Sequence, residues 1–237
     1  YTLDGTLRYS AGEVVDTITT GEDGTAQSQP LYLGRFQVKE IEFPHGMADT
    51  GENTTEVELV YAGQEVEITE TSASFYNQRQ KVLVTLNKVL EQDETFGIGM
   101  NGEITAVTFG LYAQEDITAA DGSIIPADGL LEIVSVDENG QAMCKTDLPF
   151  GSYYVKERTT NGAYILSNQE YPVVFEYAGQ ETALVQILVN EGEAVSNELL
   201  RGRVDGVKVG ENPEGGEDVT LAGALMGLLR PDTEEFT

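Results

Sequence analysis

Two stretches of the sequence repeat each other at a distance of one whole domain. "LYLGRFQVKE" at 31–40 aligns with "LPFGSYYVKE" at 148–157, an offset of 117 residues. "YAGQE" occurs at 61–65 and again at 177–181, an offset of 116 residues. Self-similarity at the length of an ordinary domain is the signature of domains arranged in tandem. The sequence therefore predicts successive copies of one fold rather than a single large domain.

The copies do not begin where the chain begins. "NQRQKVLVTLNKV" at 77–89 aligns with "NELLRGRVDGVKV" at 197–209, so a lysine-bearing strand opens each copy and an asparagine closes the copy before it. We expect the later part of a first repeat at 1–78, one complete repeat at 79–198 and the beginning of a third at 199–237. This frame is typical of a segment taken from a longer head-to-tail array.

Short runs of alternating apolar and polar residues fill the complete repeat. Examples are "KVLVTLNKV" at 81–89, "SYYVKE" at 152–157 and "YPVVFEY" at 171–177, separated by turn signals such as "DENG". Such runs indicate β-strands that bury one face, and several of them in about 120 residues indicate a β-sandwich. The predicted fold class is all-β, with tandem immunoglobulin-like β-sandwich repeats, one complete and two partial.

Three of the predicted strands each carry one polar residue on their apolar face. The three rows read Val84, Leu86 and Lys88; Tyr153, Val155 and Glu157; and Val195, Asn197 and Leu199. Alternate residues of a strand share a face. We therefore expect Lys88, Glu157 and Asn197 to point towards the core.

The partial copies carry the corresponding residues. Glu40 and Asn77 stand in the first copy, and Lys208 stands in the third. The spacing from the asparagine to the next lysine is 11 residues at both junctions, 77 to 88 and 197 to 208. We expect each residue to be completed by the missing half of its own repeat. The alternative is that Lys208 pairs with Asn77, within one chain or between two chains.

A lysine, a glutamic acid and an asparagine that share an apolar site can react with one another. An apolar setting lowers the pKa of a lysine and raises that of a carboxylic acid, which places a neutral, nucleophilic amine beside a proton donor. The amine attacks the side-chain carboxamide, the acid polarises the amide carbonyl and shuttles protons, and ammonia leaves. Each group is used once, so the chain modifies itself and is not an enzyme that turns over. The alternative is structural, with the lysine near a strand end and its ammonium in water, and with the glutamate at a sheet edge.

The charge and the rare residue types exclude several classes of function. There are 41 acidic and 13 basic residues and a net charge of −28, which disfavours nucleic-acid partners and anionic membrane surfaces. Cys144 is the only cysteine, which excludes an intrachain disulfide. With His45 as the only histidine, the chain lacks the several cysteine and histidine ligands of a structural zinc site. No apolar run reaches the roughly 20 residues of a membrane span. We expect no cofactor. Calcium in acidic turns such as "VDENG" stays open, although these turns lack the spacing of an EF-hand.

Four segments of the complete repeat resemble one known family. The lysine strand "VTLNKV", the "TFGLYA" segment, the "GSYYVKE" segment and the closing "VSN" are similar to those of Cna B-type domains. These are the prealbumin-like β-sandwich modules of Gram-positive surface adhesins and SpaA-type pilins. The resemblance implies an intramolecular isopeptide bond between Lys88 and Asn197, promoted by Glu157. Asn190 in "QILVN" is a competing acceptor, and Asn197 is preferred because it aligns with Asn77.

The resemblance also implies a function. It indicates a structural stalk module of an adhesin or pilin-like protein, extracellular and attached to the cell surface or cell wall, with neighbouring repeats as its partners. The chain departs from the family in a longer link at 91–107 and in having no sorting signal of the LPxTG type. The alternative is a ligand-binding adhesin module that recognises a host extracellular-matrix protein or a glycan. Its candidate exposed aromatic segments are "SFYNQ" at 74–78 and "NGAYIL" at 161–166, and the alternative for each segment is packing at the edge of a sheet. A carboxylate-pair glycosidase is disfavoured because the chain has no tryptophan.

Overall fold

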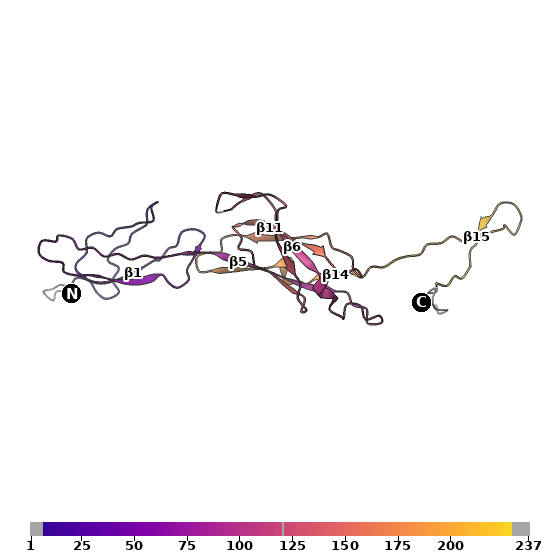
Figure 1. Ribbon diagram of the computed structural model, residues 1–237, viewed down its shortest axis with the longest axis horizontal. Helices are drawn as coiled ribbons and strands as arrows, with labels where there is room; N and C mark the ends of the chain where they lie inside the picture. The colour runs from indigo at the N-terminus through magenta and orange to yellow at the C-terminus, as the bar shows by residue number, and fades with distance from the viewer. Residues whose placement is uncertain (1–6, 120, 229–237) are drawn as a thin grey trace. The chain divides into compact units, whose positions relative to one another are not determined.

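The computed structural model describes residues 7–119 and 121–228, and its regular secondary structure consists mainly of β-strands (Figure 1). One compact unit ends at Glu198 and a second begins at Leu199. The described residues contain no α-helix, only the short 3₁₀ helices η1 (Glu103–Ala106) and η2 (Val189–Gly192). Within the same residues, no helix is long and apolar enough to cross a membrane. The predicted all-β fold class is confirmed.

The strands of the first unit fall on either side of residue 80. Before it lie β1 (Gly34–Lys39), β2 (Met47–Ala48), β3 (Thr54–Leu59) and β4 (Gln78–Arg79). After it lie β5 (Lys81–Leu90), β6 (Thr108–Ala113), β7 (Ile117–Thr118), β8 (Ile124–Ile125), β9 (Leu130–Ser135), β10 (Gln141–Cys144), β11 (Gly151–Thr159), β12 (Glu170–Phe175), β13 (Leu184–Leu188) and β14 (Val195–Asn197). The second unit contains β15 (Val209–Gly210) and β16 (Val219–Thr220), which pair with each other.

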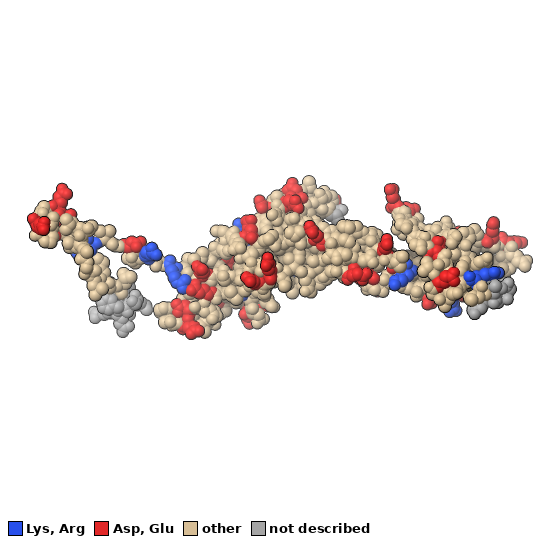
Figure 2. All heavy atoms as spheres, turned by 180° about the vertical axis from the view of Figure 1, so that it is seen from behind, with Lys and Arg blue, Asp and Glu red and all other residues tan. Residues whose placement is uncertain are grey.

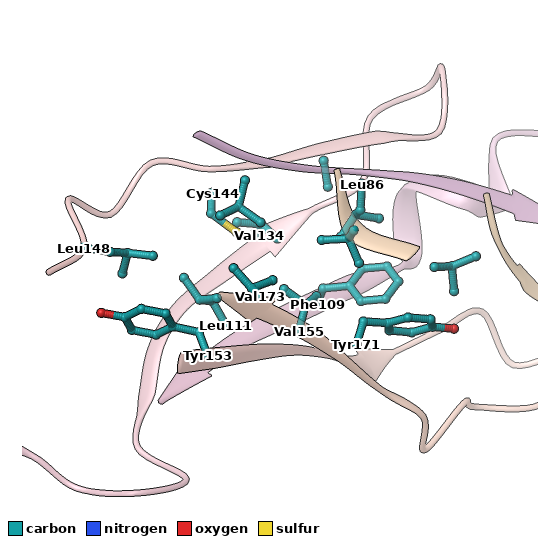
Figure 3. Packing of buried hydrophobic residues seen from close by; sticks show 14 of the residues in the cluster. Leu86, Phe109, Leu111, Val134, Cys144, Leu148, Tyr153, Val155, Tyr171 and Val173 are labelled. Atoms are coloured by element: carbon teal, nitrogen blue, oxygen red, sulfur yellow. The ribbon is translucent and has the colours of Figure 1, made fainter. Parts of the chain in front are cut away.

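Two four-stranded sheets form a β-sandwich from the strands after residue 80. One sheet has the order β10-β5-β13, with β14 also paired to β5, and the other has the order β12-β11-β6-β9. Leu86 of β5, Phe109 of β6 and Val155 of β11 belong to one buried cluster (Figure 3). Because strand alternation gives each sheet one apolar face, burying the two faces against each other builds the core.

The alternation is clear along β11, which lies between β12 and β6. Its buried residues are Tyr153, Val155 and Glu157, and the residues between them are only partly buried. In register, Val155 lies opposite Leu111 of β6 on one side and Tyr171 of β12 on the other. The inward row therefore continues through the glutamate, whose side chain occupies the next core position.

The last two strands of the sandwich both run parallel to β5. Strand β13 pairs with the first half of β5, with Ile187 opposite Val84. Strand β14 pairs with the second half, with Asn197 opposite Leu90. The turn η2 separates the two strands and contains Asn190 with a left-handed φ of 56°. The first and last strands of the sandwich are therefore direct neighbours.

The hairpin formed by β1 and β3 matches the hairpin formed by β11 and β12. Gly34 lies opposite Leu59 in the first hairpin, and Gly151 lies opposite Phe175 in the second. Both hairpins are antiparallel, and each second strand leads into a copy of "YAGQE". The two copies of the sequence motif therefore adopt the same local structure.

Acidic side chains are spread over the surface rather than gathered into one patch on the face that Figure 2 shows. They account for the net charge of −28 of the whole chain. A dispersed negative charge keeps a protein soluble through repulsion between molecules.

Candidate functional site

Three polar side chains are buried together at one end of the sandwich core. Lys88 of β5 is 2% exposed, Glu157 of β11 is 4% exposed and Asn197 of β14 is 2% exposed. Buried charges and amides are costly unless they are paired or hydrogen-bonded. The structure brings together these three residues, which strand parity predicts to point inward, with Glu157 between the other two.

The amine of Lys88 lies beside the carboxylate and near the last strand. Its Nζ is 3.8 Å from Glu157 Oε1, and it donates hydrogen bonds of 3.1 Å to the carbonyls of Val89 and Val195. Burial lowers the pKa of Lys88 to about 8, and the negative charge of Glu157 opposes part of that shift. A substantial fraction of the amine is therefore neutral in mildly alkaline solution, and a neutral amine is a nucleophile.

The other carboxylate oxygen holds the amide of Asn197. Asn197 Nδ2 donates to Glu157 Oε2 at 2.8 Å and to the carbonyl of Ile165 at 2.6 Å. The backbone N–H of Ser167 also donates to Glu157 Oε2 at 2.8 Å. The carboxyl group therefore contacts the amide at its nitrogen and not at its carbonyl oxygen, which differs from the polarising role expected from the sequence. Glu157 bridges the lysine amine and the amide nitrogen through its two oxygens.

Two buried oxygens of the site have no hydrogen-bond partner among the described residues. They are Glu157 Oε1 and Asn197 Oδ1. An unsatisfied buried polar group costs about 1–3 kcal/mol. Such groups are unusual in native proteins, and they often occur where the structure is strained or where a side chain has a catalytic role. The site therefore combines an amine of lowered pKa with an amide whose carbonyl oxygen is unpaired.

A loop between β11 and β12 positions the side chains of Glu157 and Asn197 with its backbone. Besides the two contacts above, the N–H of Ile165 donates to the carbonyl of Glu198 at 2.9 Å, which ties the loop to the end of β14. Tyr164 is only 3% exposed, and its hydroxyl donates to the carbonyl of Glu91 at 2.9 Å. The expectation that "NGAYIL" presents an exposed aromatic ring is therefore wrong, because Tyr164 packs beneath the link at 91–107.

Sequence reasoning missed this loop for a physical reason. Ile165 and Ser167 contribute a carbonyl and an N–H, which every non-proline residue possesses. No side-chain pattern marks these two positions. The turn residues Asn161 and Gly162 signal a loop but not its contacts.

A tight turn fixes the backbone of Lys88. The N–H of Lys88 donates to the carbonyl of Gly140 at 2.6 Å. Gly140 has a φ of 77°, and a Cβ added there would collide with the carbonyl oxygen of Lys88. Only glycine fits such a close approach in the left-handed region. The "DENG" turn therefore depends on its final residue.

The competing acceptor does not enter the site. Asn190 lies in η2, and its side-chain nitrogen donates to the carbonyl of Glu193 at 3.3 Å. The structure places Asn197, and not Asn190, against Glu157.

The corresponding residues of the flanking segments keep parts of the same arrangement. Asn77 Nδ2 donates to Glu40 Oε1 at 2.7 Å, and Glu40 Oε2 has no hydrogen-bond partner among the described residues. Lys208 is exposed, and its Nζ donates to the carbonyl of Val209 at 3.3 Å, as Lys88 does to Val89. The glutamate–asparagine contact therefore recurs in the first segment.

Other reactive side chains lie outside this site. No group of three or more His, Cys, Asp or Glu that could hold a metal ion occurs in residues 7–119 and 121–228. Cys144 is buried, and burial raises its pKa to about 12. A thiol in that state is unreactive.

Comparisons with known proteins find similarity in structure. No protein-family model matches the chain, and no curated protein is similar to it in sequence. The Bacillus anthracis TIE protein is similar at a TM-score of 0.46 and 18% identity, over 86% of this chain and 35% of that one. BcpA, the major pilin subunit of Bacillus cereus, is similar at a TM-score of 0.28 and 16% identity, over 50% of this chain and 29% of that one. The major pilin SpaA of Corynebacterium diphtheriae is similar at a TM-score of 0.30 and 12% identity, over 61% of this chain and 38% of that one.

The chain spans about a third of the TIE protein. BcpA and SpaA are major pilins. At these TM-scores, the assignment of a β-sandwich rests on the strand pairings and the core described above.

Proposed function

We propose that this chain is a structural stalk module of a Gram-positive adhesin or pilin-like protein, stabilised by a self-formed isopeptide bond between Lys88 and Asn197. One observation carries the proposal. Glu157 lies 3.8 Å from the lysine amine through one oxygen and 2.8 Å from the asparagine amide nitrogen through the other. A carboxyl group in that position can accept a proton from the attacking amine and donate a proton to the departing amide nitrogen.

The reaction proceeds by proton relay through Glu157. Lys88 passes a proton to Oε1, and its neutral Nζ attacks Cγ of Asn197. The new Nζ–Cγ bond forms while the Cγ–Nδ2 bond breaks. Glu157 passes the proton it has taken up to Nδ2, so the leaving group departs as ammonia, and the second proton that Nζ loses on becoming an amide nitrogen goes to the carboxylate of Glu157. The chain loses one ammonia, about 17 Da, and both reactants are consumed in a single event.

The bond ties the beginning of the sandwich to its end. By analogy with a disulfide, a crosslink that closes a loop of roughly 100 residues stabilises the fold by about 4–5 kcal/mol. Strands β5 and β14 are parallel neighbours, so a pulling force that enters β5 passes through the bond into β14. This mechanical link suits a stalk that resists shear. It needs no oxidant, in a chain with a single cysteine.

The location and partners follow from this role. A stalk module works outside the cell, attached to the cell surface or wall, with neighbouring repeats at 1–78 and 199–237 as its partners. The proposal gives the chain no catalytic turnover and no cofactor. In the major pilin SpaA, isopeptide bonds stabilise a modular pilus assembly, and we propose the same device here.

Intact mass under denaturing conditions tests the proposal. We expect the mass to fall short of the sequence mass by one ammonia, and we expect Lys88→Ala, Glu157→Ala and Asn197→Ala to restore the full mass. Asn190→Ala is the matched control and should keep the loss. A full mass in the unmodified sequence would falsify the bond. A loss of two ammonia molecules would indicate that Lys208 also pairs with Asn77.

A second candidate function is ligand binding by an adhesin module, favoured by an aromatic groove on the outer face of the sheet. The rings of Tyr112 and Tyr154 stack with centroids 5.1 Å apart and planes 10° apart. Asp128, Lys156 and Arg158 line the same groove. Stacked aromatic rings flanked by polar groups suit a glycan or a host extracellular-matrix protein. A binding assay against a panel of such components tests this function. Binding that is lost in Tyr112→Ala would support it, and no binding to any component would leave the stalk function as the remaining candidate.

A further inference from the structure

Residues 41–49 of the first segment lie against one loop of the sandwich, residues 177–183, which we term the coupling loop. The N–H of Asp49 donates to the carbonyl of Gln180 at 2.8 Å. The N–H of Phe43 donates to the side-chain oxygen of Gln180 at 3.1 Å. The side-chain nitrogen of Gln180 donates to the carbonyl of Ile41 at 3.3 Å. Gln180 therefore binds three backbone groups of the opposing segment, one with its main chain and two with its side chain.

A buried glutamine supports the coupling loop from below. Gln80 is 0% exposed, and its Nε2 donates to the carbonyls of Gly179 and Thr182 at 3.0 and 2.6 Å. Its side-chain oxygen accepts from the N–H of Ala178 at 2.9 Å, and its backbone N–H donates to Gly46 at 2.8 Å. A fully bonded buried amide specifies one arrangement of its neighbours, because each lost bond leaves an unsatisfied group. Gln80 thus fixes the loop and the opposing turn at the same time.

Aromatic rings complete the contact. His45 lies over Tyr177 with ring centroids 4.6 Å apart and near Phe150 at 6.3 Å. The hydroxyl of Tyr177 donates to the carbonyl of Met47 at 3.3 Å. A Cβ added at Gly46 would lie 3.1 Å from the Phe150 ring, so the turn approaches that ring closely. The contact therefore combines hydrogen bonds with ring packing.

The connection between the two segments is a single residue long. Strand β4 ends at Arg79 and β5 begins at Lys81, so only Gln80 separates them. Arg79 donates to the carbonyl of Leu148 at 2.8 Å and forms an ion pair with Asp147. Domains in tandem usually move relative to each other through flexible, polar linkers. Here the connecting residue itself is buried and bonded.

We propose that the coupling loop recognises the turn at 41–49 of the neighbouring repeat and holds the two repeats as one rigid body. The inference goes beyond the proposed stalk function and does not depend on the isopeptide bond. Its partner is the turn that follows the glutamate strand of another repeat. The same role extends to "YAGQE" at 61–65, which follows the equivalent hairpin and whose Tyr61 is 56% exposed.

Distance measurement between spin labels on the full chain tests this coupling. Labels at Glu56→Cys of β3 and Ile133→Cys of β9 occupy exposed positions on the two segments. Cys144 is buried and its thiol is not labelled, which a chain without the introduced cysteines checks. We expect one narrow distance peak. A broad distribution in this chain overturns the proposal.

Variants of the coupling loop separate rigid coupling from mere proximity. Replacing Gln80 and Gln180 together by alanine removes the amide network, and we expect the narrow peak to be lost. The matched control replaces the exposed Gln114 and Gln141 by alanine and should keep the peak. His45→Ala, at an exposed position, offers a milder change that leaves the amide bonds intact, and we expect it to broaden the peak.

Two further measurements control for loss of the fold and for loss of the isopeptide bond. Unchanged circular dichroism shows that the sandwich still folds, and the ammonia loss is scored separately, so failure of the bond and failure of the coupling are distinguishable. If the peak stays narrow both in the folded double variant and in His45→Ala, the coupling role is wrong.

Discussion

Lys88 and Asn197 lie on neighbouring parallel strands, two register positions apart. Lys88 of β5 is opposite Val195 of β14, and Asn197 is opposite Leu90. Because alternate residues of a strand share a face, both side chains lie on the inner face of the first sheet. Glu157 reaches them from β11 of the facing sheet. The site therefore exists only when both sheets are assembled.

Removing the proton relay should stop bond formation without removing bulk. Glu157→Gln keeps the size of the side chain but cannot take a proton from Lys88. We expect an intact mass without ammonia loss and a free energy of unfolding lower by about 4–5 kcal/mol, the crosslink contribution. Mass spectrometry and urea unfolding measure the two effects. Glu115→Gln, an exposed position, should behave as the parent chain, and full ammonia loss in Glu157→Gln would contradict the relay.

The lowered pKa of Lys88 predicts how an unlinked chain responds to pH. Its pKa is about 8 in the folded protein and 10.5 when unperturbed. Between these values the unfolded state binds more protons than the folded state, so the free energy of unfolding rises with pH in that window. Below about pH 8 both states hold the proton and this contribution is flat.

Asn197→Ala provides the unlinked chain for this measurement, because it has no acceptor. Urea unfolding at several pH values should show the rise between about pH 8 and 10.5. Adding Lys88→Met to the same background removes the titrating group and should remove the rise. An identical pH dependence in the two chains would show that Lys88 keeps its ordinary pKa.

The backbone N–H of Ser167 should matter more than its side chain. Ser167→Pro deletes the donor to Glu157 Oε2, whereas Ser167→Ala keeps it. A hydrogen bond to a charged group contributes about 1.5–3 kcal/mol. We therefore expect a mixture of linked and unlinked chains for the proline variant and full linkage for the alanine variant. Mass spectrometry of freshly folded protein gives the ratio, and equal linkage in both would exclude a positioning role.

The turn that holds Lys88 should tolerate no side chain at Gly140. Gly140→Ala adds a Cβ that collides with the Lys88 carbonyl, in a backbone with positive φ. Gly122→Ala is the matched control, since Gly122 also has a positive φ but nothing within 4 Å of the added atom. The left-handed conformation alone costs about 1–2 kcal/mol per residue. We expect the Gly140 variant to lose clearly more stability than the control in urea unfolding, and equal losses would argue against the steric conflict.

Much of the fold and of the candidate site could be predicted from the alternation of apolar and polar residues along the strands. The apolar rows of β5, β11 and β14 place Lys88, Glu157 and Asn197 at inward positions, because burial in a sandwich follows the parity of the strand. The recurrence of one hairpin motif also predicts the matching registers of β1–β3 and β11–β12. These features depend on side-chain pattern, which a sequence displays.

The remaining features depend on the backbone or on distant contacts. The carbonyl of Ile165 and the N–H of Ser167 have no sequence signature, and the burial of Tyr164 depends on a carbonyl in the link at 91–107. Which end of the Asn197 amide meets the carboxyl is decided by its second acceptor, the Ile165 carbonyl. The network around Gln80 joins residues about 100 positions apart along the chain, beyond the reach of local periodicity.

The three groups of the site come from strands that meet only in the finished sandwich, and the proposed reaction releases ammonia, which is diluted into the solvent. The proposed covalent bond therefore forms only in the folded chain and persists after the chain unfolds. A chain that has folded once keeps the bond after it is denatured, and a chain that has never folded lacks it. In denatured material from a cell or a refolding trial, mass spectrometry can therefore distinguish chains that have folded from chains that have never folded.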